Sequence, residues 1–405
     1  MNESSTSRLG RVLHVIPSLS TAHGGPSFAL PLMARSLAQA GWSVDVATTD
    51  DDGPGKRVDV PHGRRVEREG YGVFYFPKQT EFYKVSLPLG AWLRRHVRDY
   101  DVIHVHALFS HASTAAGRAA RRTGVPYVIR PLGVLNRWGM ENRRRWLKAL
   151  SFRWVEQPLL RGAAAVHYTS EAERVEAEAA GVTTRAAVIP LGIDTAAFEN
   201  LPGAESFFAK WPQLRGRKIV LFLSRLDPKK GLELLIPAFA KVRRTVPEAV
   251  LVIAGDGAAD YEKACRQLAA DAGISGDIVW PGYLGGELKL AAFAAASVFV
   301  LPSHSENFGI AVVEAMAAGL PCVTTTGVAV SAEVLAGDAG RVVEPDSTAL
   351  TAALIELLTD DGRRKKCAVN ARRLASEKFS LAAMGRNLTE LYRQIAAAHR
   401  RGSAE

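Results

Sequence analysis

Two glutamates, Glu306 and Glu314, stand eight positions apart in an apolar stretch that reads SENFGIAVVEAMAAGLPCV. The stretch follows the apolar run Val298–Leu301, and its Gly309 and Gly319 predict the start and the end of a helix. Amide groups at a helix N-terminus bind phosphate, and carboxylates accept hydrogen bonds from sugar hydroxyls. The pair therefore predicts a site for a ligand that is part sugar and part phosphate. The alternative for an isolated pair is that Glu306 is only a charge at a helix N-terminus and Glu314 only a solvent-exposed helix residue.

Two cations precede this stretch in the segment LFLSRLDPKKGLELLI. Arg225 follows the apolar run Ile219–Leu223, and Lys230 stands five positions later, before a helical pattern. Two fixed cations would stabilise the negative charge that accumulates on a diphosphate leaving group. The alternative for Lys230 is one charge of an exposed Lys229–Lys230 pair. Because Arg225 comes directly after a predicted strand, we interpret both cations as a phosphate site.

Two adjacent glycines, Gly24 and Gly25, follow the first apolar run, Val12–Ile16. Glycine has no side chain, so the backbone at this turn can approach a phosphate or a sugar closely. A Gly-Gly turn is common in proteins that bind neither. Because this turn lies between a predicted strand and a helix beginning near Pro26, binding of a phosphate or sugar is as good an interpretation as an ordinary turn.

Polar residues also end apolar runs in the first half of the chain. His106 ends the run Asp101–Val105, and Arg130 ends the next one. An imidazole there could hydrogen-bond a sugar hydroxyl, and Arg130 could bind an anionic part of the donor or the acceptor. The alternative for Arg130 is an ordinary strand-end charge. His111 is a second candidate on the acceptor side, whereas His104 lies inside the run and is expected to be buried and structural.

Short apolar runs alternate with helical patterns along nearly the whole chain. Most runs lack a period of two, as expected for parallel strands that helices cover on both faces. Prolines and glycines interrupt this pattern over Asp194–Gly216. The pattern predicts two doubly wound, Rossmann-like α/β domains, residues 1–197 and 198–381, which face each other across a cleft. A final helix within 382–405 could pack back on the first domain.

The chain has 405 residues, 47% of them hydrophobic and 23% charged, with a mean hydropathy of zero. This excludes a disordered chain, a collagen-like fibre and a disulfide-stapled miniprotein. A net charge of +10 favours an anionic partner. The three cysteines form no Cys-x-x-Cys pair, the first residues do not resemble a signal peptide, and no apolar run has membrane-helix length. We therefore expect a cytoplasmic protein, which could still lie at the inner face of the membrane.

Four stretches together resemble the retaining glycosyltransferases of family 4, which have the GT-B fold. Ser305–Val323 resembles their Glu-x7-Glu motif, and Leu221–Ile236 resembles their phosphate-binding segment, with both cations in the matching positions. Val188–Phe198 resembles the interdomain segment, with Leu191 where the family usually has Asn. The stretch PSLSTAHGGPS resembles the glycine-rich loop. The four occur in the family's order and span most of the chain.

The resemblance implies an enzyme that moves a hexose-like sugar from a UDP- or GDP-linked donor to a hydroxyl of a glycan or lipid-linked acceptor. Such reactions build cell-surface polysaccharides or glycolipids. The implied catalytic residues are His106, Glu306, Arg225 and Lys230. The implied donor-binding residues are Gly24, Gly25, Arg225, Lys230, Asp256, Tyr283, Glu306, Asn307, Phe308, Gly309 and Glu314. The implied acceptor-side residues are Arg130 and His111.

Retention at the anomeric carbon usually requires a carboxylate nucleophile, and no clear candidate stands on the acceptor side. We therefore hypothesise front-side displacement, in which the leaving phosphate helps to deprotonate the acceptor hydroxyl. Glu306 then positions the sugar hydroxyls, and Glu314 binds the ribose hydroxyls. No Asp-x-Asp triplet follows an apolar strand, and no His/Cys cluster has ligand spacing. We predict that the reaction needs no metal and no cofactor beyond the nucleotide-sugar co-substrate.

The segment Arg137–Arg161 concentrates positive charge, with seven Lys and Arg against two Glu. Trp138, Trp146 and Trp154 recur in it at eight-residue spacing. A basic amphipathic helix with tryptophans is typical of a segment that lies on an anionic membrane surface. The alternative is a helix packed on the core whose charges are solvated.

Other function classes fit the sequence less well. No basic stripe alternates with stacking aromatics, so nucleic acid is not a predicted partner. A catalytically silent sugar-nucleotide-binding scaffold subunit, or a sugar-nucleotide epimerase of related fold, would share the donor motifs. The presence of both glutamates and both cations favours transfer.

Overall fold

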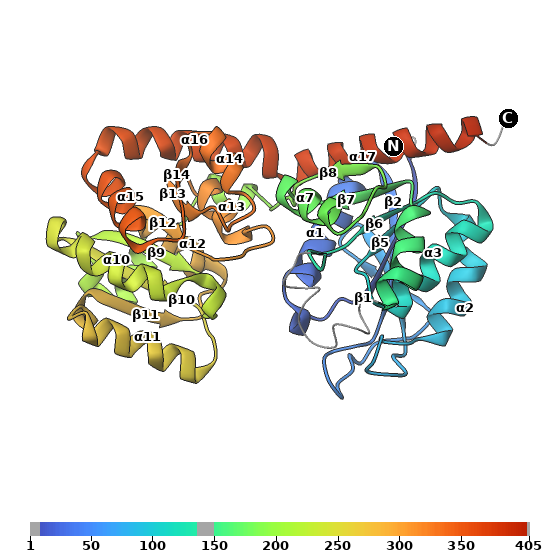
Figure 1. The fold of residues 1–405 in the computed structure, drawn as a ribbon, viewed down its shortest axis with the longest axis horizontal. Coiled ribbons are helices and arrows are strands. Elements are labelled where there is room, and N and C mark those ends of the chain that lie inside the picture. The colour runs from blue at the N-terminus through green and yellow to red at the C-terminus, as the bar shows by residue number, and fades with distance from the viewer. Residues whose placement is uncertain (1–8, 136–149, 403–405) are drawn as a thin grey trace, which may run out of the picture. The chain divides into compact units, whose positions relative to one another are not determined.

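The computed structural model describes residues 9–135 and 150–402 (Figure 1). Backbone contacts divide the chain into two units, Met1–Gly192 together with Leu381–Glu405, and Ile193–Ser380. Each unit has a sheet of its own. The chain therefore leaves the N-terminal unit once and returns to it for its last helix.

Among the described residues, eight strands form the sheet of the N-terminal unit, in the order β3-β4-β2-β1-β5-β6-β7-β8. They are β1 (Gly10–Ser18), β2 (Trp42–Thr49), β3 (Arg65–Arg68), β4 (Tyr71–Phe76), β5 (Val102–His106), β6 (Tyr127–Arg130), β7 (Ala165–Tyr168) and β8 (Ala186–Val188). Only β3 runs antiparallel to its neighbour, β4. Leu13, Val15, Ile103 and Val105 are fully buried in this core. Burial of the central strands on both faces explains their continuous apolar runs.

Three helices of this unit begin at a serine that caps their first turn. The helices are α1 (Gly25–Gln39), α2 (Leu87–His96), α3 (His111–Thr123), α6 (Gln157–Arg161), α7 (Glu171–Ala179) and α17 (Leu381–Gly402), with the 3-10 turns η1 (Thr21–His23) and η2 (Val97–Asp99) and the π-helical segment η3 (Phe152–Glu156). The side chains of Ser86, Ser110 and Ser170 accept amides of the first turns of α2, α3 and α7.

Helix α17, drawn in red in Figure 1, packs against α1 of the N-terminal unit. The Nε1 of Trp42 donates to the Oγ1 of Thr389 at 3.0 Å. Tyr392 is fully buried, and its hydroxyl lies 2.6 Å from the Nδ1 of His104. The last helix therefore completes the core of the N-terminal unit.

Six parallel strands form the sheet of the C-terminal unit, in the order β11-β10-β9-β12-β13-β14. The strands are β9 (Lys218–Leu223), β10 (Ala249–Ala254), β11 (Ile278–Gly282), β12 (Val298–Leu301), β13 (Cys322–Thr325) and β14 (Gly340–Val343). The helices are α8 (Ala196–Glu199), α9 (Glu205–Lys210), α10 (Leu232–Thr245), α11 (Ala259–Asp271), α12 (Gly286–Ala295), α13 (Ile310–Ala317), α14 (Ser331–Ala336), α15 (Ser347–Thr359) and α16 (Asp361–Phe379). The predicted α/β class with two parallel-rich, Rossmann-like sheets is confirmed.

Three local features differ from the sequence prediction. Strand β3 was not predicted, because its sequence Arg-Val-Glu-Arg is mostly charged and exposed at a sheet edge. Strand β14 was missed because it has only four residues, one of them an arginine. The stretch Asp194–Gly216, predicted to be irregular, contains the short helices α8 and α9.

Candidate functional site

The loop after β9 carries both predicted phosphate-binding cations. The Arg225 side chain is 74% exposed, with its guanidinium 3.9 Å from the carboxylate of Asp227. That carboxylate also accepts the backbone amide of Lys229 at 3.0 Å and starts the 3-10 turn η5 (Pro228–Lys230). Lys230 ends this turn, directly before the residue that joins it to α10.

That joining residue is Gly231, whose φ of 73° lies in the left-handed region that favours glycine. A Cβ atom on Gly231 would stand 2.1 Å from the carbonyl oxygen of Pro302, just beyond β12. The missing side chain therefore lets the loop that carries Arg225 and Lys230, called the phosphate loop below for its predicted role, pack directly on the loop after β12. This packing brings the side chains of Lys230 and Glu306 into an ion pair.

The loop after β12 fixes Glu306 directly before α13. Its amide donates to the carbonyl of Gly327 at 2.9 Å, and its own carbonyl accepts the amide of Ala329 at 3.0 Å. Helix α13 starts after Gly309, which has a φ of 100°. Glu314 lies within the helix, as predicted.

Glu314 is paired with a lysine that sequence reasoning missed. The Nζ of Lys289, in α12, lies 2.8 Å from the Oε1 of Glu314. Lys289 stands in an ordinary helical pattern, 25 positions before Glu314. No sequence spacing relates the two residues, so only the packing of α12 near α13 reveals their contact. Each glutamate of the motif therefore has a lysine partner.

Asp256 and Tyr283 follow β10 and β11 at the same carboxyl edge of the sheet. The carbonyl of Asp256 accepts the amide of Leu226 at 2.9 Å, which joins its loop to the phosphate loop. A Cβ atom on Gly257 would stand 2.1 Å from the carbonyl oxygen of Leu226, so this approach requires glycine. Tyr283 is 75% exposed and offers an open aromatic ring.

Asn307 and Phe308 complete the predicted donor residues, and the structure separates them. Asn307 is exposed, whereas the Phe308 side chain is buried with its ring edge-on to Phe379 at 5.9 Å. Phe308 therefore anchors the loop in the core, and a donor contact from this residue would come from its backbone. The predicted residues of this unit follow neighbouring parallel strands, which explains why they share one edge.

In the N-terminal unit, Gly24 joins η1 to α1, and Gly25 is the first residue of that helix. Gly24 has a φ of 76°, and a Cβ atom on either glycine would meet nothing within 4 Å. Glycine at position 24 is thus favoured by the left-handed backbone conformation, and the space beside the loop is open.

This glycine-rich loop is anchored by a buried aspartate, Asp51, which the sequence did not point out. Its carboxylate pairs with His23 at 2.7 Å and with Lys78 at 2.7 Å, and it also contacts Lys84. Burial alone would raise the pKa of Asp51, but the hydrogen bonds from both lysines outweigh it and lower this pKa to about 2. Asp51 is therefore a charged anchor for the loop.

His106 ends β5 in a fully buried group of histidines. Its Nε2 lies 2.9 Å from the Nδ1 of His14, and its Nδ1 has no partner among the described residues. His104 is buried, as predicted, with its Nε2 3.3 Å from His167. Since the Nε2 of His167 must donate to the carbonyl of Ile189 at 2.8 Å, the neutral His167 ring accepts from His104. The four rings thus form two hydrogen-bonded pairs, His14 with His106 and His104 with His167, and the pairs meet where the rings of His104 and His106 stack.

Burial also sets the charge of this group. It lowers the pKa of His104 and His106 well below 6.5, and lowers that of His14 to about 3. The Arg130 guanidinium, buried among them, strengthens the effect. Burial lowers the pKa of Arg130 itself to about 10, against the attraction of Glu173. At neutral pH, His106 is a neutral imidazole beside a buried cation.

Arg130 and His111 were both predicted on the acceptor side. Arg130 is buried, and its Nε has no hydrogen-bond partner among the described residues, so its acceptor role stays a prediction. His111 is the first residue of α3, and its Nδ1 accepts the amide of Ser86 at 3.3 Å. Its described contact is therefore structural, and its acceptor role stays a prediction.

Lowering the pH below 6.5 is expected to destabilise the N-terminal unit. The unfolded chain then binds protons at His14, His104, His106 and His167 that the folded chain does not. Each such histidine lowers the free energy of unfolding by up to about 1.4 kcal/mol per pH unit below 6.5 and contributes no pH dependence above it. For His14 and His167 the effect extends down to pH about 3.

Urea unfolding between pH 7.5 and 4.5, followed by hydrogen exchange in β1 and β5, measures this dependence. His14→Asn should reduce the pH slope, and His399→Asn, at an exposed position in α17, should not. Equal slopes for His14→Asn and the unmodified chain would contradict the prediction.

Three of these histidines, His14, His104 and His106, place one ring nitrogen each within 4.8 Å of one another. However, the rings of His104 and His106 stack at 4.3 Å, and the nitrogens of His104 are engaged by Tyr392 and His167. We interpret the group as a hydrogen-bonded cluster. The absence of a metal requirement stays a prediction.

The basic segment Arg137–Arg161 is described only from residue 150 onward, so Trp138 and Trp146 lie outside the described residues. Phe152 packs against the core, whereas Trp154 is 68% exposed and carries the guanidinium of Arg153 at 5.8 Å from its ring. Glu156 is fully buried and bonded to Tyr83. Within the described ranges, no helix is both long and apolar enough to cross a membrane.

Comparison with known proteins assigns both halves of the chain. Residues 204–374 match the family described as "Glycosyl transferases group 1". Residues 24–192 match the family described as "Glycosyl transferase 4-like domain". Together these matches extend over nearly all of both sheets.

Individual relatives agree with this assignment. A GDP-mannose-dependent alpha-(1-6)-phosphatidylinositol monomannoside mannosyltransferase of Mycolicibacterium smegmatis is 33% identical over 50% of this chain and 55% of its own, so the match spans about half of that protein. A D-inositol 3-phosphate glycosyltransferase of Corynebacterium urealyticum is 29% identical over 94% of this chain and 93% of its own. The crystal structure of HepE from Anabaena, in complex with UDP and glucose, has a TM-score of 0.72 at 21% identity and covers 94% of this chain and 98% of its own.

Proposed function

The chain belongs to the group 1 glycosyltransferases of family 4, and from this membership we propose that it is a retaining, metal-independent transferase. It moves a sugar from a UDP- or GDP-linked donor to a hydroxyl of a glycan or lipid-linked acceptor. The observation that supports this most is the pairing of Glu306 with Lys230 and of Glu314 with Lys289 beside the N-terminus of α13. This arrangement offers cations and amides for a diphosphate, and carboxylates for hydroxyls.

The donor binds with its diphosphate between Arg225, Lys230 and the first amides of α13. As the bond from the anomeric carbon to the phosphate oxygen breaks, negative charge grows on the diphosphate, and both cations stabilise it. Lys230, drawn to the phosphate, releases Glu306 to accept hydrogen bonds from sugar hydroxyls. Glu314 accepts hydrogen bonds from the ribose. The leaving phosphate oxygen takes the proton of the acceptor hydroxyl while that hydroxyl attacks the same face of the sugar.

The N-terminal unit holds the acceptor. His106 is neutral and can hydrogen-bond the donor sugar without adding charge. Arg130 suits an anionic group of the acceptor because its buried Nε has no partner among the described residues. The two relatives reported above act, by their names, on a phosphatidylinositol mannoside and on inositol phosphate, and both of these acceptors carry a phosphate. We therefore propose a phosphate-bearing acceptor.

Incubating the pure protein with UDP-, GDP- and ADP-sugars tests the proposal without a known acceptor. One donor should release its nucleoside diphosphate slowly through transfer to water. A donor that binds but is never cleaved would instead support a catalytically silent scaffold subunit. A donor whose sugar is epimerised while the nucleotide stays attached would support an epimerase.

A membrane surface is the second proposed partner. Leu150 and Trp154 project from the beginning of the described basic segment, and the neighbouring Phe82 is exposed as well. The link between Tyr83 and Ser151, 3.2 Å apart, holds these two segments together. Exposed aromatic and aliphatic side chains beside concentrated Lys and Arg suit an anionic bilayer.

Trp154→Ser is expected to weaken binding to vesicles of phosphatidylcholine and phosphatidylglycerol about 10-fold, because it removes the largest exposed apolar side chain of this surface. Flotation with and without phosphatidylglycerol measures the effect. Val175→Ser, at an exposed apolar position on α7 outside this surface, is the control. Equal flotation of the unmodified chain and both variants would contradict a membrane surface here. Flotation that does not depend on salt concentration would contradict it as well.

A further inference from the structure

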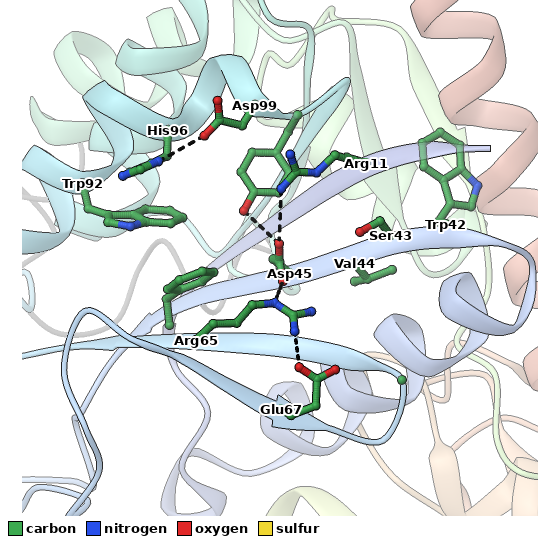
Figure 2. A pocket seen from close by; sticks show the side chains of 13 residues that line it. Arg11, Trp42, Ser43, Val44, Asp45, Arg65, Glu67, Trp92, His96 and Asp99 are labelled. Carbon is green, nitrogen blue, oxygen red and sulfur yellow. Dashed lines mark hydrogen bonds and ion pairs between the residues drawn. The ribbon is translucent and has the colours of Figure 1, made fainter. Parts of the chain in front are cut away.

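A cavity of about 580 Å³ opens at the amino edge of the N-terminal sheet (Figure 2). Its residues come from the starts of β1 and β2, from β3 and β4, and from α2 and the turn after it. Arg11 lies at the start of β1, and the loop that leads to Gly24 begins after Ser18, at the other end of the strand. Seven residues of extended chain span about 23 Å. The cavity is therefore remote from the glycine-rich loop, and the proposed transfer makes no use of it.

One wall is an ordered network of charged groups around Asp45. This buried carboxylate accepts the Nε of Arg65 at 2.7 Å and the hydroxyl of Tyr100 at 3.0 Å, with the guanidinium of Arg11 at 4.0 Å. Arg65 also pairs with Glu67 (Figure 2). Both arginine side chains remain about half exposed, so each keeps N–H groups that face the opening.

A glycine makes room for this wall. A Cβ atom on Gly72, in β4, would stand 2.2 Å from the Nε of Arg65 and 2.5 Å from the Oδ1 of Asp45. Any other residue at this position would displace the arginine from the aspartate. The network therefore depends on a specific feature of the sequence and is fixed before any ligand arrives.

Aromatic side chains also line the cavity. The Trp92 ring, on α2, lies 4.7 Å from the ring of Phe74 and 4.8 Å from that of His96, centroid to centroid. Trp42 contributes at the other end, with its Nε1 already bonded to Thr389. These rings give the cavity flat apolar surfaces beside its hydrogen-bonding groups.

The charges of the cavity identify the class of ligand. Arg11, Arg65 and His96 line the cavity together with Asp45, Glu67 and Asp99, so an anion would meet three carboxylates and a cation would meet two guanidinium groups. A neutral hydroxyl both donates and accepts, and it can use either kind of group. The C–H face of a sugar ring packs on aromatic rings, and the volume is typical of a small-ligand site. We propose that this cavity binds a neutral oligosaccharide, away from the site of sugar transfer.

Binding of neutral gluco-, manno- and galacto-oligosaccharides to the full chain, measured by saturation-transfer NMR and calorimetry without donor, tests this site. At least one should bind with a Kd of roughly 1 mM or below. Ser43→Trp, which fills the cavity from β2, and Arg11→Ala should weaken that binding at least 10-fold. Arg244→Ala, at an exposed position of the C-terminal unit, should leave it unchanged.

Lys230→Ala, which impairs the proposed sugar transfer, should still bind the oligosaccharide. A failure of the proposed transfer can therefore be distinguished from a failure of the proposed oligosaccharide site. Ser43→Trp should keep the unmodified rate of donor hydrolysis. The site would be overturned if the unmodified chain bound none of the oligosaccharides at 10 times the expected Kd of roughly 1 mM. Undiminished binding by Ser43→Trp, or displacement of the oligosaccharide by inorganic phosphate or UDP, would overturn it as well.

Discussion

Replacing Lys230 by alanine is expected to lower kcat for sugar transfer by about 100- to 1000-fold, the range for loss of one preorganised charge-stabilising group. The backbone of Lys230 is held in place by the η5 turn and by the close approach of Gly231 to Pro302, so it is fixed before the donor binds. A preorganised cation stabilises the leaving diphosphate without reorganising during the reaction. For that reason the loss should appear in kcat more than in the KM for the donor.

Arg225→Ala should have a smaller effect, about 10- to 100-fold, because the Arg225 side chain is 74% exposed and water screens its charge. Steady-state rates with the donor identified by the nucleotide-sugar panel measure both variants. Lys241→Ala, an exposed lysine in α10, is the matched control and should stay near the unmodified rate.

Lys230→Ala also leaves Glu306 without its ion-pair partner, and this must be separated from the loss of a phosphate contact. The double variant Lys230→Ala/Glu306→Gln removes the unpaired carboxylate. If the phosphate contact matters, the double variant should be no faster than Lys230→Ala. Recovery of activity in the double variant, or near-normal kcat in Lys230→Ala, would exclude Lys230 as a ligand of the leaving group.

The sequence was sufficient to predict the fold and the sheet edge that carries the predicted donor residues. Arg225, Asp256, Tyr283 and Glu306 each follow a short apolar run, and parallel strands bring their carboxyl ends to one edge. The helix containing Glu314 could be predicted because glycines stand at both its ends. Local chain properties were enough for these predictions.

Contacts between distant elements could not be predicted in the same way. Lys289, in α12, meets Glu314, in α13, only through the tertiary fold, and Asp51 meets Lys78 across a loop of no recognisable pattern. The cavity at the amino edge depends on β3, whose charged sequence predicts no strand. Such sites arise from tertiary packing of residues that look ordinary in sequence.

The two glutamates of the motif should fail in different ways when each is replaced by glutamine. Glu306→Gln is expected to lower kcat about 100-fold, because Glu306 pairs with Lys230 and, in the proposed mechanism, binds hydroxyls of the sugar whose bond breaks. Glu314→Gln is expected to raise the KM for the donor about 10-fold with a smaller change in kcat, since a hydrogen bond from ribose to a charged group is lost equally in ground and transition states. Glu287→Gln, an exposed carboxylate on α12, is the control.

Calorimetric binding of the free nucleoside diphosphate separates these roles further, because that ligand has the ribose and lacks the transferred sugar. Glu314→Gln should bind it about 10-fold more weakly, and Glu306→Gln should bind it nearly as well as the unmodified chain. The reverse pattern would exchange the two assignments. Equal binding by both variants, combined with unchanged kcat, would show that the paired lysines hold these carboxylates for structure alone.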